Sequence, residues 1–417
     1  MIGVICDKTQ RPFVAEFFEL FKVQWEYCVD ERQYDVVIIT GSTEACPQAK
    51  LTIAFSSEKK SYDFGQVTER GPSPEPVIVE HGGCRFPVYG KVAKIESSFE
   101  PILKVLETDE SVGVKYVIER QTIIRVGYDL FDEVQYRLEK GQPVSQAIIP
   151  TVDMHIGQLR KWIVDAGICV VEIPPIPSGY GFVACLTHDV DFVNIRDHQL
   201  LDRSVLGFIA RSLFPNHLRN TRSEIVWSRI LKNWRALLSL PAVYLGLCRD
   251  IWFDIDRYMD LERGLGSTYY FIPLKGHPGA SGNHIEPHWR AARYDVRAYQ
   301  SLVKELKQQR CEIGVHGLDA WHDPKKGMRE REILQSISGE ENVGIRMHWL
   351  YFSKESPQML EEAGFAYDST VGYNEANGFR CGTTQVFCSP GSTRLLELSL
   401  NVMDTAFFYS ERMGVSE

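Results

Sequence analysis

The sequence lacks several signals that assign chains to common classes. Its first residues show no basic segment followed by an apolar run and a small-residue cleavage site, so we expect a cytoplasmic protein without a secretory signal. The most apolar stretch, residues 236–247, is too short to span a bilayer. Its 10 cysteines include no CxxC pair, which favours reduced, buried thiols over a zinc site built from cysteine.

The chain also lacks an excess of positive charge. It has 46 Lys and Arg against 55 Asp and Glu, a formal net charge of −9, which argues against nucleic acid as the main partner. The first half contains no GxGxxG, GxxxxGK[ST] or GxSxG motif, so it shows no catalytic signal and its role is open. A hydrophobic content of 44% is typical of a globular protein, and 417 residues are enough for two domains.

The first domain is predicted over residues 1–175. β-branched runs at 2–6, 25–29 and 34–40, with a helical pattern at 13–21, predict a smaller α/β domain of flavodoxin-like or Rossmann-like type. The other elements expected here are strands at 51–55, 76–79 and 123–127, loops over 56–76, and helices up to Gly141 and over 153–166.

A second domain is predicted over residues 176–417, after a run of prolines at 174, 175 and 177. Strands are expected at 182–187, 267–272, 311–315, 343–347, near 367 and at 395–400, with helices at 296–309, 326–337 and 355–363. A helical insertion is expected at about 192–264. Alternating strands and helices predict a parallel barrel or a doubly wound sheet.

Polar residues follow the predicted strands of this second domain. Asp189 and Asp191 stand two apart at a strand end, so both side chains share a face. One carboxylate can bind a metal while the other acts as a base, although such a pair also caps turns. His316 follows another strand and is followed by Gly317, whereas His322 and Asp319 could join it or cap the next helix.

Two further segments complete the set. Arg346 and His348 share a face of the next strand end, where the arginine could hold a carboxylate and the histidine could be a ligand, or both could be structural. Asp368 and Arg380 are interpreted as a buried pair that supports the site. Because the carboxyl ends of parallel strands meet at one face, we expect these residues to converge.

The ordered motifs THDVD, HGLDAWHD, RMHW, YDST…GFRCGT and LLELSLNVMD, over residues 182–408, resemble polysaccharide deacetylases of the NodB-homology, carbohydrate esterase family 4-like type. The resemblance implies a distorted (β/α) barrel with fewer than eight strands that removes N- or O-acetyl groups from a saccharide with a divalent metal, Zn²⁺ above all. It makes Asp189 the general base, Arg346 the residue that orients it, and Asp191 and His316 metal ligands. A backbone N–H near Trp349 would stabilise the oxyanion, and Trp349, Asp368 and Arg380 are taken as substrate-binding residues.

The chain departs from the family pattern in ways that bear on the ligands. Val190 separates the two acids, and Ala320 stands where the second motif has its second histidine. His348 stands where the third motif usually has proline, so we infer that His348 is the third ligand and that His322 is its rival.

The family's C-terminal Leu-x-His motif, whose histidine serves as general acid, is missing, since no histidine follows His348. We favour a C-terminally incomplete barrel, with a barrel closed without that strand, or a weakened enzyme, as the alternatives. Two other functions therefore stay open: a saccharide-binding protein on the same fold, and a related C–N hydrolase acting on a small amide.

The insertion carries five arginines along an aromatic and aliphatic stretch, 203–234. They are interpreted as the solvated face of a helical cap, with contact to an anionic membrane or a lipid-linked sugar phosphate as the alternative. Three histidines nearby, His277, His284 and His288, are expected at most to contact substrate. The sequence does not indicate the oligomeric state.

Overall fold

The computed structural model describes residues 1–44, 47–71, 75–213, 223–250, 252–281 and 284–408. The chain is a mixed α/β protein with parallel strands in both of its large sheets. It divides into two compact units, Met1–Val183 with Asp368–Glu417, and Ala184–Tyr367. None of the described helices is both long and apolar enough to cross a membrane.

Unit 1 is built on a nine-stranded sheet of order β2-β1-β3-β4-β11-β10-β9-β6-β7. Its elements before residue 166 are β1 (Ile2–Ile5), α1 (Arg11–Phe21), β2 (Trp25–Tyr27), β3 (Val36–Ile39), β4 (Leu51–Phe55), β5 (Gln66–Glu69), β6 (Val77–His81), β7 (Cys84–Val88), β8 (Ala93–Glu96), β9 (Glu100–Val105), β10 (Ser111–Ile118), β11 (Gln121–Val126), α2 (Leu130–Glu139) and α3 (Thr151–Asp165). The β2-β1-β3-β4-β11 part is parallel, and the rest is antiparallel.

The parallel part of this sheet agrees with the predicted α/β pattern, but the antiparallel part was not predicted. Gly82 and Gly83, both with positive φ, form the turn between β6 and β7, and a Gly-Gly pair between two short apolar runs is a hairpin signal that the sequence did contain. The segment predicted as loops over 56–76 also contains β5, which pairs with β8.

The C-terminal segment, Asp368–Glu417, is part of unit 1. It contains β19 (Phe387–Cys388), β20 (Leu396–Glu397) and α10 (Asp404–Phe408), and β18 (Tyr367–Asp368) lies at the division. β19 contacts α1, where the Cys388 amide donates to the Glu16 carboxylate at 2.8 Å. Glu16 and Cys388, which are 372 positions apart in sequence, are therefore brought together only by tertiary contacts.

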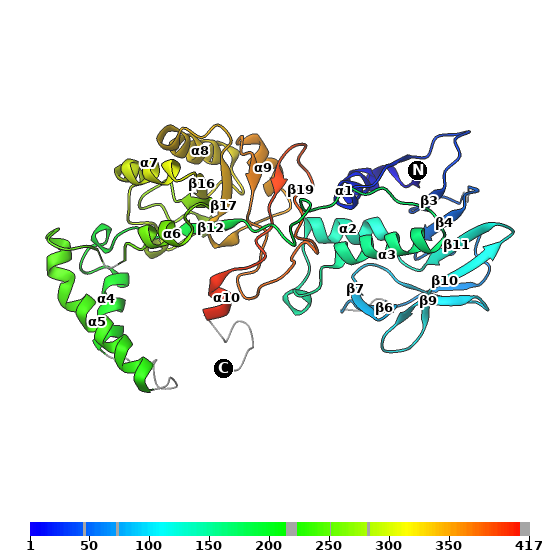
Figure 1. Ribbon diagram of the computed structural model, residues 1–417, viewed down its shortest axis with the longest axis horizontal. Coiled ribbons are helices and arrows are strands. Elements are labelled where there is room, and N and C mark those ends of the chain that lie inside the picture. Colours follow the sequence, from blue (N-terminus) through cyan, green and yellow to red (C-terminus); the bar gives the residue numbers. More distant parts are fainter. Residues whose placement is uncertain (45–46, 72–74, 214–222, 251, 282–283, 409–417) are drawn as a thin grey trace. The chain divides into compact units, whose positions relative to one another are not determined.

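Unit 2 contains four parallel strands in the order β12-β13-β16-β17. Its elements are β12 (Leu186–Val190), α4 (Arg203–Leu213), α5 (Ser223–Tyr244), α6 (Ile255–Leu261), β13 (Ser267–Phe271), β14 (Ala280–Ser281), β15 (His284–Ile285), α7 (Gln300–Gln308), β16 (Glu312–Gly317), α8 (Pro324–Ser338), β17 (Gly344–Met347) and α9 (Ser356–Glu362). Helices α7 and α8 pack against β16, as Figure 1 shows. The pairings of the described strands do not close into a barrel, so the predicted barrel is not shown.

The first strand of unit 2 starts later than predicted. Phe182 and Val183, expected in the strand, are exposed, and β12 begins at Leu186 opposite Ser267, the first residue of β13. The earlier residues run past the end of the neighbouring strand and have no ladder partner there.

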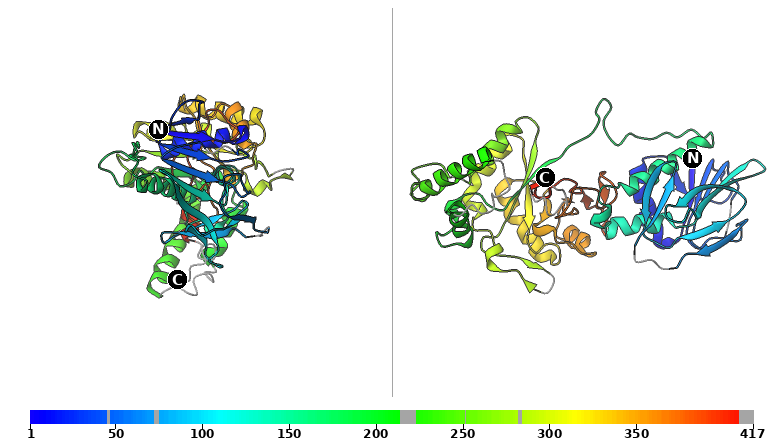
Figure 2. Two further views of the ribbon diagram at one scale, coloured as in Figure 1. Left: turned by 90° about the vertical axis from the view of Figure 1, so that its right-hand side faces the viewer. Right: turned by 90° about the horizontal axis from the view of Figure 1, so that it is seen from below.

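The predicted helical insertion is occupied by α4, α5 and α6, and both views of Figure 2 show α4 and α5 extending from unit 2.

Candidate metal centre

The parallel sheet of unit 2 brings five of the predicted site residues to one edge. Asp189 lies near the end of β12 and Asp191 directly after it. His316 is the second-last residue of β16, and it pairs with Arg346 of β17 in the strand register. His348 follows β17 at once. Side chains from three separate strands therefore meet at the carboxyl edge of the sheet, as is typical of sites in parallel α/β proteins.

Asp191, His316 and His348 form a group with the geometry of a metal site. The Asp191 Oδ1 atom lies 3.4 Å from Nε2 of His316 and 3.4 Å from Nε2 of His348, and one ligand atom from each residue lies within 4.8 Å of the others. A tetrahedral ion with bonds of about 2.1 Å separates its ligands by about 3.4 Å. Three protein ligands also leave a fourth position for water or substrate, as catalytic zinc sites do.

The hydrogen bonds around the group indicate that a cation fits it. The Nδ1 atom of His316 lies 2.9 Å from the Arg346 carbonyl, which can only accept, so Nδ1 carries the proton in the neutral ring. Its Nε2 lone pair then faces the Asp191 carboxylate, which cannot donate either. Within the described residues, buried Asp191 Oδ1 has no hydrogen-bond partner. A divalent ion between these atoms would satisfy all of them.

The electrostatics of the group also suit a ligand set. Burial raises the pKa of Asp191, but the neighbouring His316 and His348 rings outweigh burial and hold that pKa below its usual value. Burial and the neighbouring His316 lower the pKa of His348 to about 4, so this ring is neutral near pH 7. An ionised carboxylate and a neutral imidazole are the protonation states that metals bind.

His316 is the exception within the group. Burial lowers its pKa, but the charges of Asp189 and Asp191 outweigh burial and raise it. A proton on Nε2 of His316 competes with an ion for the same lone pair, so the affinity for the ion becomes weaker as the pH falls.

Asp189 is held beside this group by Arg346. The Nη1 atom of Arg346 donates to the Asp189 carboxylate at 3.0 Å and to the Thr187 hydroxyl at 2.8 Å, and its guanidinium lies over the Tyr270 ring at 4.7 Å. Arg346 is buried while Asp189 is partly exposed. Arg346 therefore fixes the position of the Asp189 carboxylate, and its role in catalysis stays a prediction.

His322 does not join the three-residue group. Its Nε2 atom lies 3.5 Å from Oδ1 of Asp319, a buried carboxylate. Asp319 also accepts from His277 Nε2 at 2.8 Å and from Lys326 Nζ at 3.0 Å. Burial raises the pKa of Asp319, but His277 and Lys326 outweigh burial and lower it, so Asp319 is a charged anchor for a partly exposed histidine.

The pairing of His277 with Asp319 was not predicted, because the two residues lie on different loops. The His277 loop is fixed above the end of β16: the Trp321 indole donates to the Ala280 carbonyl at 3.2 Å, and a Cβ on Gly279 would stand 3.1 Å from the Leu318 carbonyl. His277 therefore lies at the same edge of the sheet as the metal-ligand candidates.

Trp349 has a strained backbone beside the candidate ligands. Its φ is +63°, in the left-handed region that costs a non-glycine residue about 1 kcal/mol or more. Its exposed ring contacts His348 at 5.4 Å between centroids, and the Arg290 guanidinium lies 4.1 Å from its centre. Arg290 is itself held by Glu286 and Tyr351. The strain keeps an aromatic ring at the rim of the site, and its substrate contact stays a prediction.

Asp368 and Arg380 belong to unit 1. Asp368 accepts from the amide and hydroxyl of Thr370, and Arg380 donates to the Gly372 carbonyl at 2.6 Å. These contacts shape the segment that follows β18. Their predicted roles in supporting the site and in binding substrate stay predictions.

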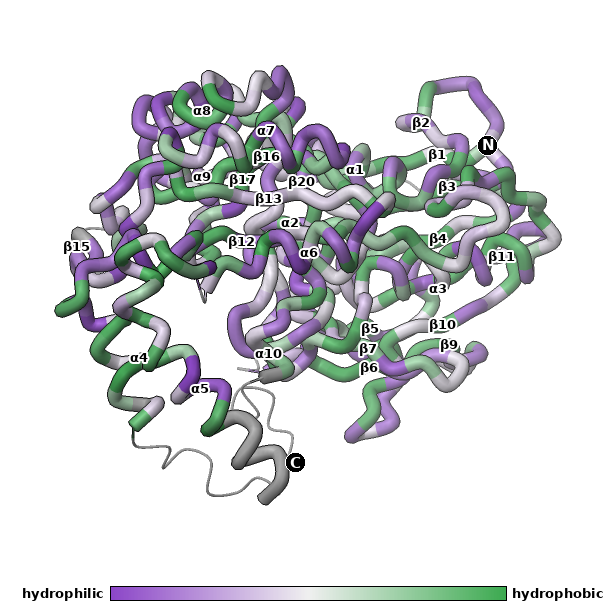
Figure 3. The backbone as a smooth tube through the Cα atoms, turned by 60° about the vertical axis from the view of Figure 1, so that its left-hand side comes forward, coloured by the Kyte–Doolittle hydropathy of each residue, from purple (hydrophilic) through white to green (hydrophobic). Residues whose placement is uncertain are grey.

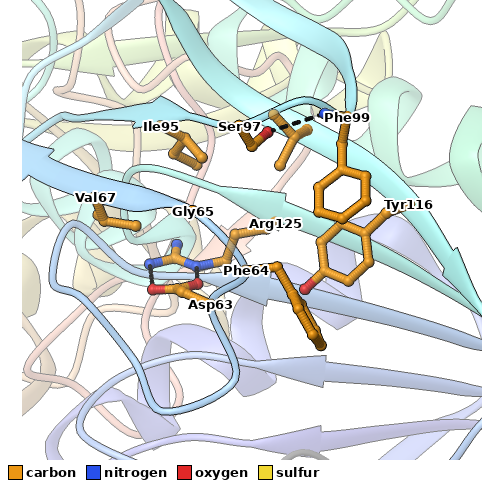
Figure 4. A pocket seen from close by; sticks show the side chains of 10 residues that line it. Asp63, Phe64, Gly65, Val67, Ile95, Ser97, Phe99, Tyr116 and Arg125 are labelled. Atoms are coloured by element: carbon orange, nitrogen blue, oxygen red, sulfur yellow. Dashed lines mark hydrogen bonds and ion pairs between the residues drawn. The ribbon is translucent and has the colours of Figure 1, made fainter.

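Unit 1 has a small pocket whose charged groups are already paired. Figure 4 shows Arg125 against Asp63, with Phe64, Phe99 and Tyr116 on one side. Arg125 donates to the Asp63 carboxylate at 2.7 Å and to the carbonyls of Ser56 and Glu58 at 2.6 Å. The charged groups of this pocket are therefore already hydrogen-bonded to one another and to the backbone. For this reason we place the candidate catalytic site in unit 2.

Comparisons with solved structures find distant likenesses. A "putative polysaccharide deacetylase from Mycobacterium smegmatis" aligns at 16% identity and a TM-score of 0.26 over 55% of this chain and 63% of that one. A beta-galactosidase from the psychrophilic Marinomonas ef1 aligns at 10% identity and a TM-score of 0.27 over 42% and 30%. A scan against protein-family models and a search of curated proteins find no match. Neither likeness is close enough to support a function, so the candidate site rests on its own geometry.

Proposed function

We propose that the chain is a metal-dependent hydrolase that removes acetyl groups from an N-acetylated or O-acetylated saccharide. The observation that carries the proposal is the convergence of Asp191, His316 and His348, with Asp189 held beside them by Arg346. The saccharide part rests on the motif resemblance.

The chain's own residues supply the proton transfers that amide hydrolysis needs. A divalent ion held by Asp191, His316 and His348 would polarise the acyl carbonyl and acidify water. Asp189, kept in place by Arg346, takes the proton from the attacking water. The water oxygen bonds to the acyl carbon, the carbon–nitrogen bond breaks, and acetate and an amine leave.

The departing nitrogen needs a proton, and we assign its delivery to His277. The Asp319 carboxylate lies 2.8 Å from Nε2 of this ring and orients it, so Nδ1 is the atom left to pass a proton to the leaving group. His277 would thereby take the role of the C-terminal histidine that the family motif has and that does not follow His348 here.

Metal content and acetate release test the proposal. The purified protein should contain about one divalent ion per chain and release acetate from N-acetylated chito-oligosaccharides. Treatment with a chelator should abolish release, and added Zn²⁺ should restore it. A protein without stoichiometric metal would contradict the proposal and favour a saccharide-binding protein. Metal with activity on small amides alone would favour the related C–N hydrolase.

A further inference from the structure

Helices α4 and α5 form a hairpin whose charge is opposite to that of the whole chain. Residues 203–249 contain eight arginines and lysines and a single acidic residue, Glu224, whereas the chain as a whole is acidic. Of the arginines predicted to form a basic face, Arg219 and Arg222 lie outside the described residues, as do the side chains of Arg211 and Arg229. Between residues 230 and 249, the exposed charges that the structure describes are Lys232, Arg235 and Arg249, and Arg249 forms an ion pair with Asp256 at 3.1 Å.

One face of the hairpin is buried against the rest of unit 2. Val205 of α4 and Leu240 and Val243 of α5 form a buried cluster with Ile195. The Tyr244 hydroxyl also donates to the carbonyls of Ile195 and His198, at 3.1 and 2.9 Å. These contacts fix which face of α5 is turned outward.

The outward face carries large apolar side chains. Five of them, on α5 and in the turn after it, have between 44% and 77% of their surface exposed: Leu231, Trp234, Leu238, Leu245 and Leu247. Leu231, Trp234 and Leu238 follow one another at spacings of three and four, so they lie on one side of the helix. Figure 3 shows α4 and the described part of α5 with much hydrophobic colour. We call Leu231, Trp234, Leu238, Lys232 and Arg235 the hairpin face.

The positive charge on the hairpin face favours an anionic lipid surface over a second copy of the chain as its partner. A second copy of the chain would bring positive charge against positive charge, because a twofold interface uses the same surface patch of both subunits. An anionic lipid surface instead complements the basic residues and accepts leucine and tryptophan side chains at the level of its headgroups. No described helix can span a bilayer, so contact would lie along the surface.

We propose that the hairpin face binds the surface of a membrane that contains anionic lipid. Leu231 and Leu238 enter the boundary between headgroups and acyl chains, Trp234 lies at headgroup level, and Lys232 and Arg235 contact lipid phosphates. The proposal is independent of the hydrolase activity, and it would hold the acetyl-removing site near lipid-linked or surface saccharides.

Vesicle co-sedimentation of the full chain tests this proposal. The protein should sediment with vesicles of phosphatidylcholine and phosphatidylserine at low salt, bind pure phosphatidylcholine at least about tenfold more weakly, and be released at high salt. The double variant K232E/R235E should weaken binding at least about tenfold, since each basic residue near an anionic surface changes the partition about fivefold. L231E/L238E should abolish it.

Matched controls separate the hairpin face from general effects of charge. Leu265 is exposed before β13, and Lys304 is exposed on α7, both away from the hairpin. L265E and K304E should leave vesicle binding unchanged, and circular dichroism should show that all variants keep the fold. Absence of binding to anionic vesicles, or binding that the hairpin variants do not alter, would overturn the proposal. A dimer in sedimentation velocity that L231E/L238E dissociates would overturn it in favour of a second copy.

Discussion

At the scale of single residues, the sequence offered two histidines as the third metal ligand. His348 and His322 were both candidates for the third ligand, and spacing alone did not separate them. The structure places His348 Nε2 at 3.4 Å from Asp191, whereas His322 lies against Asp319. The difference depends on the turn after β17, where Trp349 adopts a positive φ that no local pattern predicts.

The first prediction follows from that difference. H348A should lower the affinity for Zn²⁺ by about 100-fold or more, because it removes one of three ligands, with a loss of acetate release. H322A should change the affinity by less than about threefold. Isothermal titration of the metal-free proteins measures both. If the two variants lost affinity equally, His322 would have to be a ligand as well.

A second prediction concerns His277 and the leaving group. An amide needs its nitrogen protonated, whereas the nitrophenolate of 4-nitrophenyl acetate leaves without a proton. H277A should therefore lower kcat on an N-acetylated saccharide by about 100-fold or more and change the ester rate by less than about threefold. H284A, in the same loop, is the control. Equal losses on both substrates, or bound metal lost in H277A, would show that His277 has a structural role.

At the scale of elements, the sequence predicted the parallel strands well because they are buried, β-branched runs ended by polar residues. The antiparallel half of the unit 1 sheet was missed, since β7, β9 and β10 each include exposed positions at one end and are therefore hard to tell from the neighbouring loops. The convergence of Asp189, Asp191, His316 and His348 was expected from the rule that parallel strands share a carboxyl edge. The loop that brings His277 to Asp319 was not, because loop paths depend on contacts distant in sequence.

A glycine within β16 gives a third prediction. A Cβ on Gly314 would stand 2.5 Å from the Tyr270 ring, on which Arg346 lies. G314A should therefore lower the free energy of unfolding by about 1–3 kcal/mol and disturb the Arg346–Asp189 pair. Urea unfolding and the pH profile of activity measure the two effects.

The control for that variant is a glycine with open space around it. A Cβ on Gly157, within helix α3, meets nothing within 4 Å, so G157A should leave stability unchanged or raise it by up to about 1 kcal/mol. A G314A protein as stable as the wild type would mean that Tyr270 can move away without cost.

At the scale of the whole molecule, the two units are not two consecutive stretches of sequence. Residues 1–183 and 368–417 together form unit 1, and residues 184–367, which lie between them in the sequence, form unit 2. Composition and periodicity describe neighbours along the chain. They could not reveal that residues 368–408, which return to unit 1, pack against residues more than 200 positions earlier in the sequence. The contacts of residues 368–408 with the rest of unit 1 include backbone hydrogen bonds and side-chain hydrogen bonds, such as that from the Thr383 hydroxyl to Asp153 at 2.8 Å.

The last prediction tests that arrangement. Backbone hydrogen bonds join the returning segment to the end of α2 and the start of α3: Gln142 N to Arg380 O at 2.8 Å, Phe379 N to Ala147 O at 2.7 Å, and Val152 N to Gly382 O at 2.9 Å. Each contributes about 0.5–1.5 kcal/mol, so together they are a large part of a stability of about 5–15 kcal/mol. A fragment of residues 1–183 should unfold about 10 °C or more below the same fragment joined by a flexible linker to residues 368–408. Calorimetry of the two fragments measures the difference. The joined fragment with Gly382→Val is the control. A Cβ at position 382 would stand 2.5 Å from the Thr151 hydroxyl, so this variant should weaken the contact between the returning segment and residues 1–183. Equal melting temperatures for all three would mean that residues 1–183 fold without the returning segment.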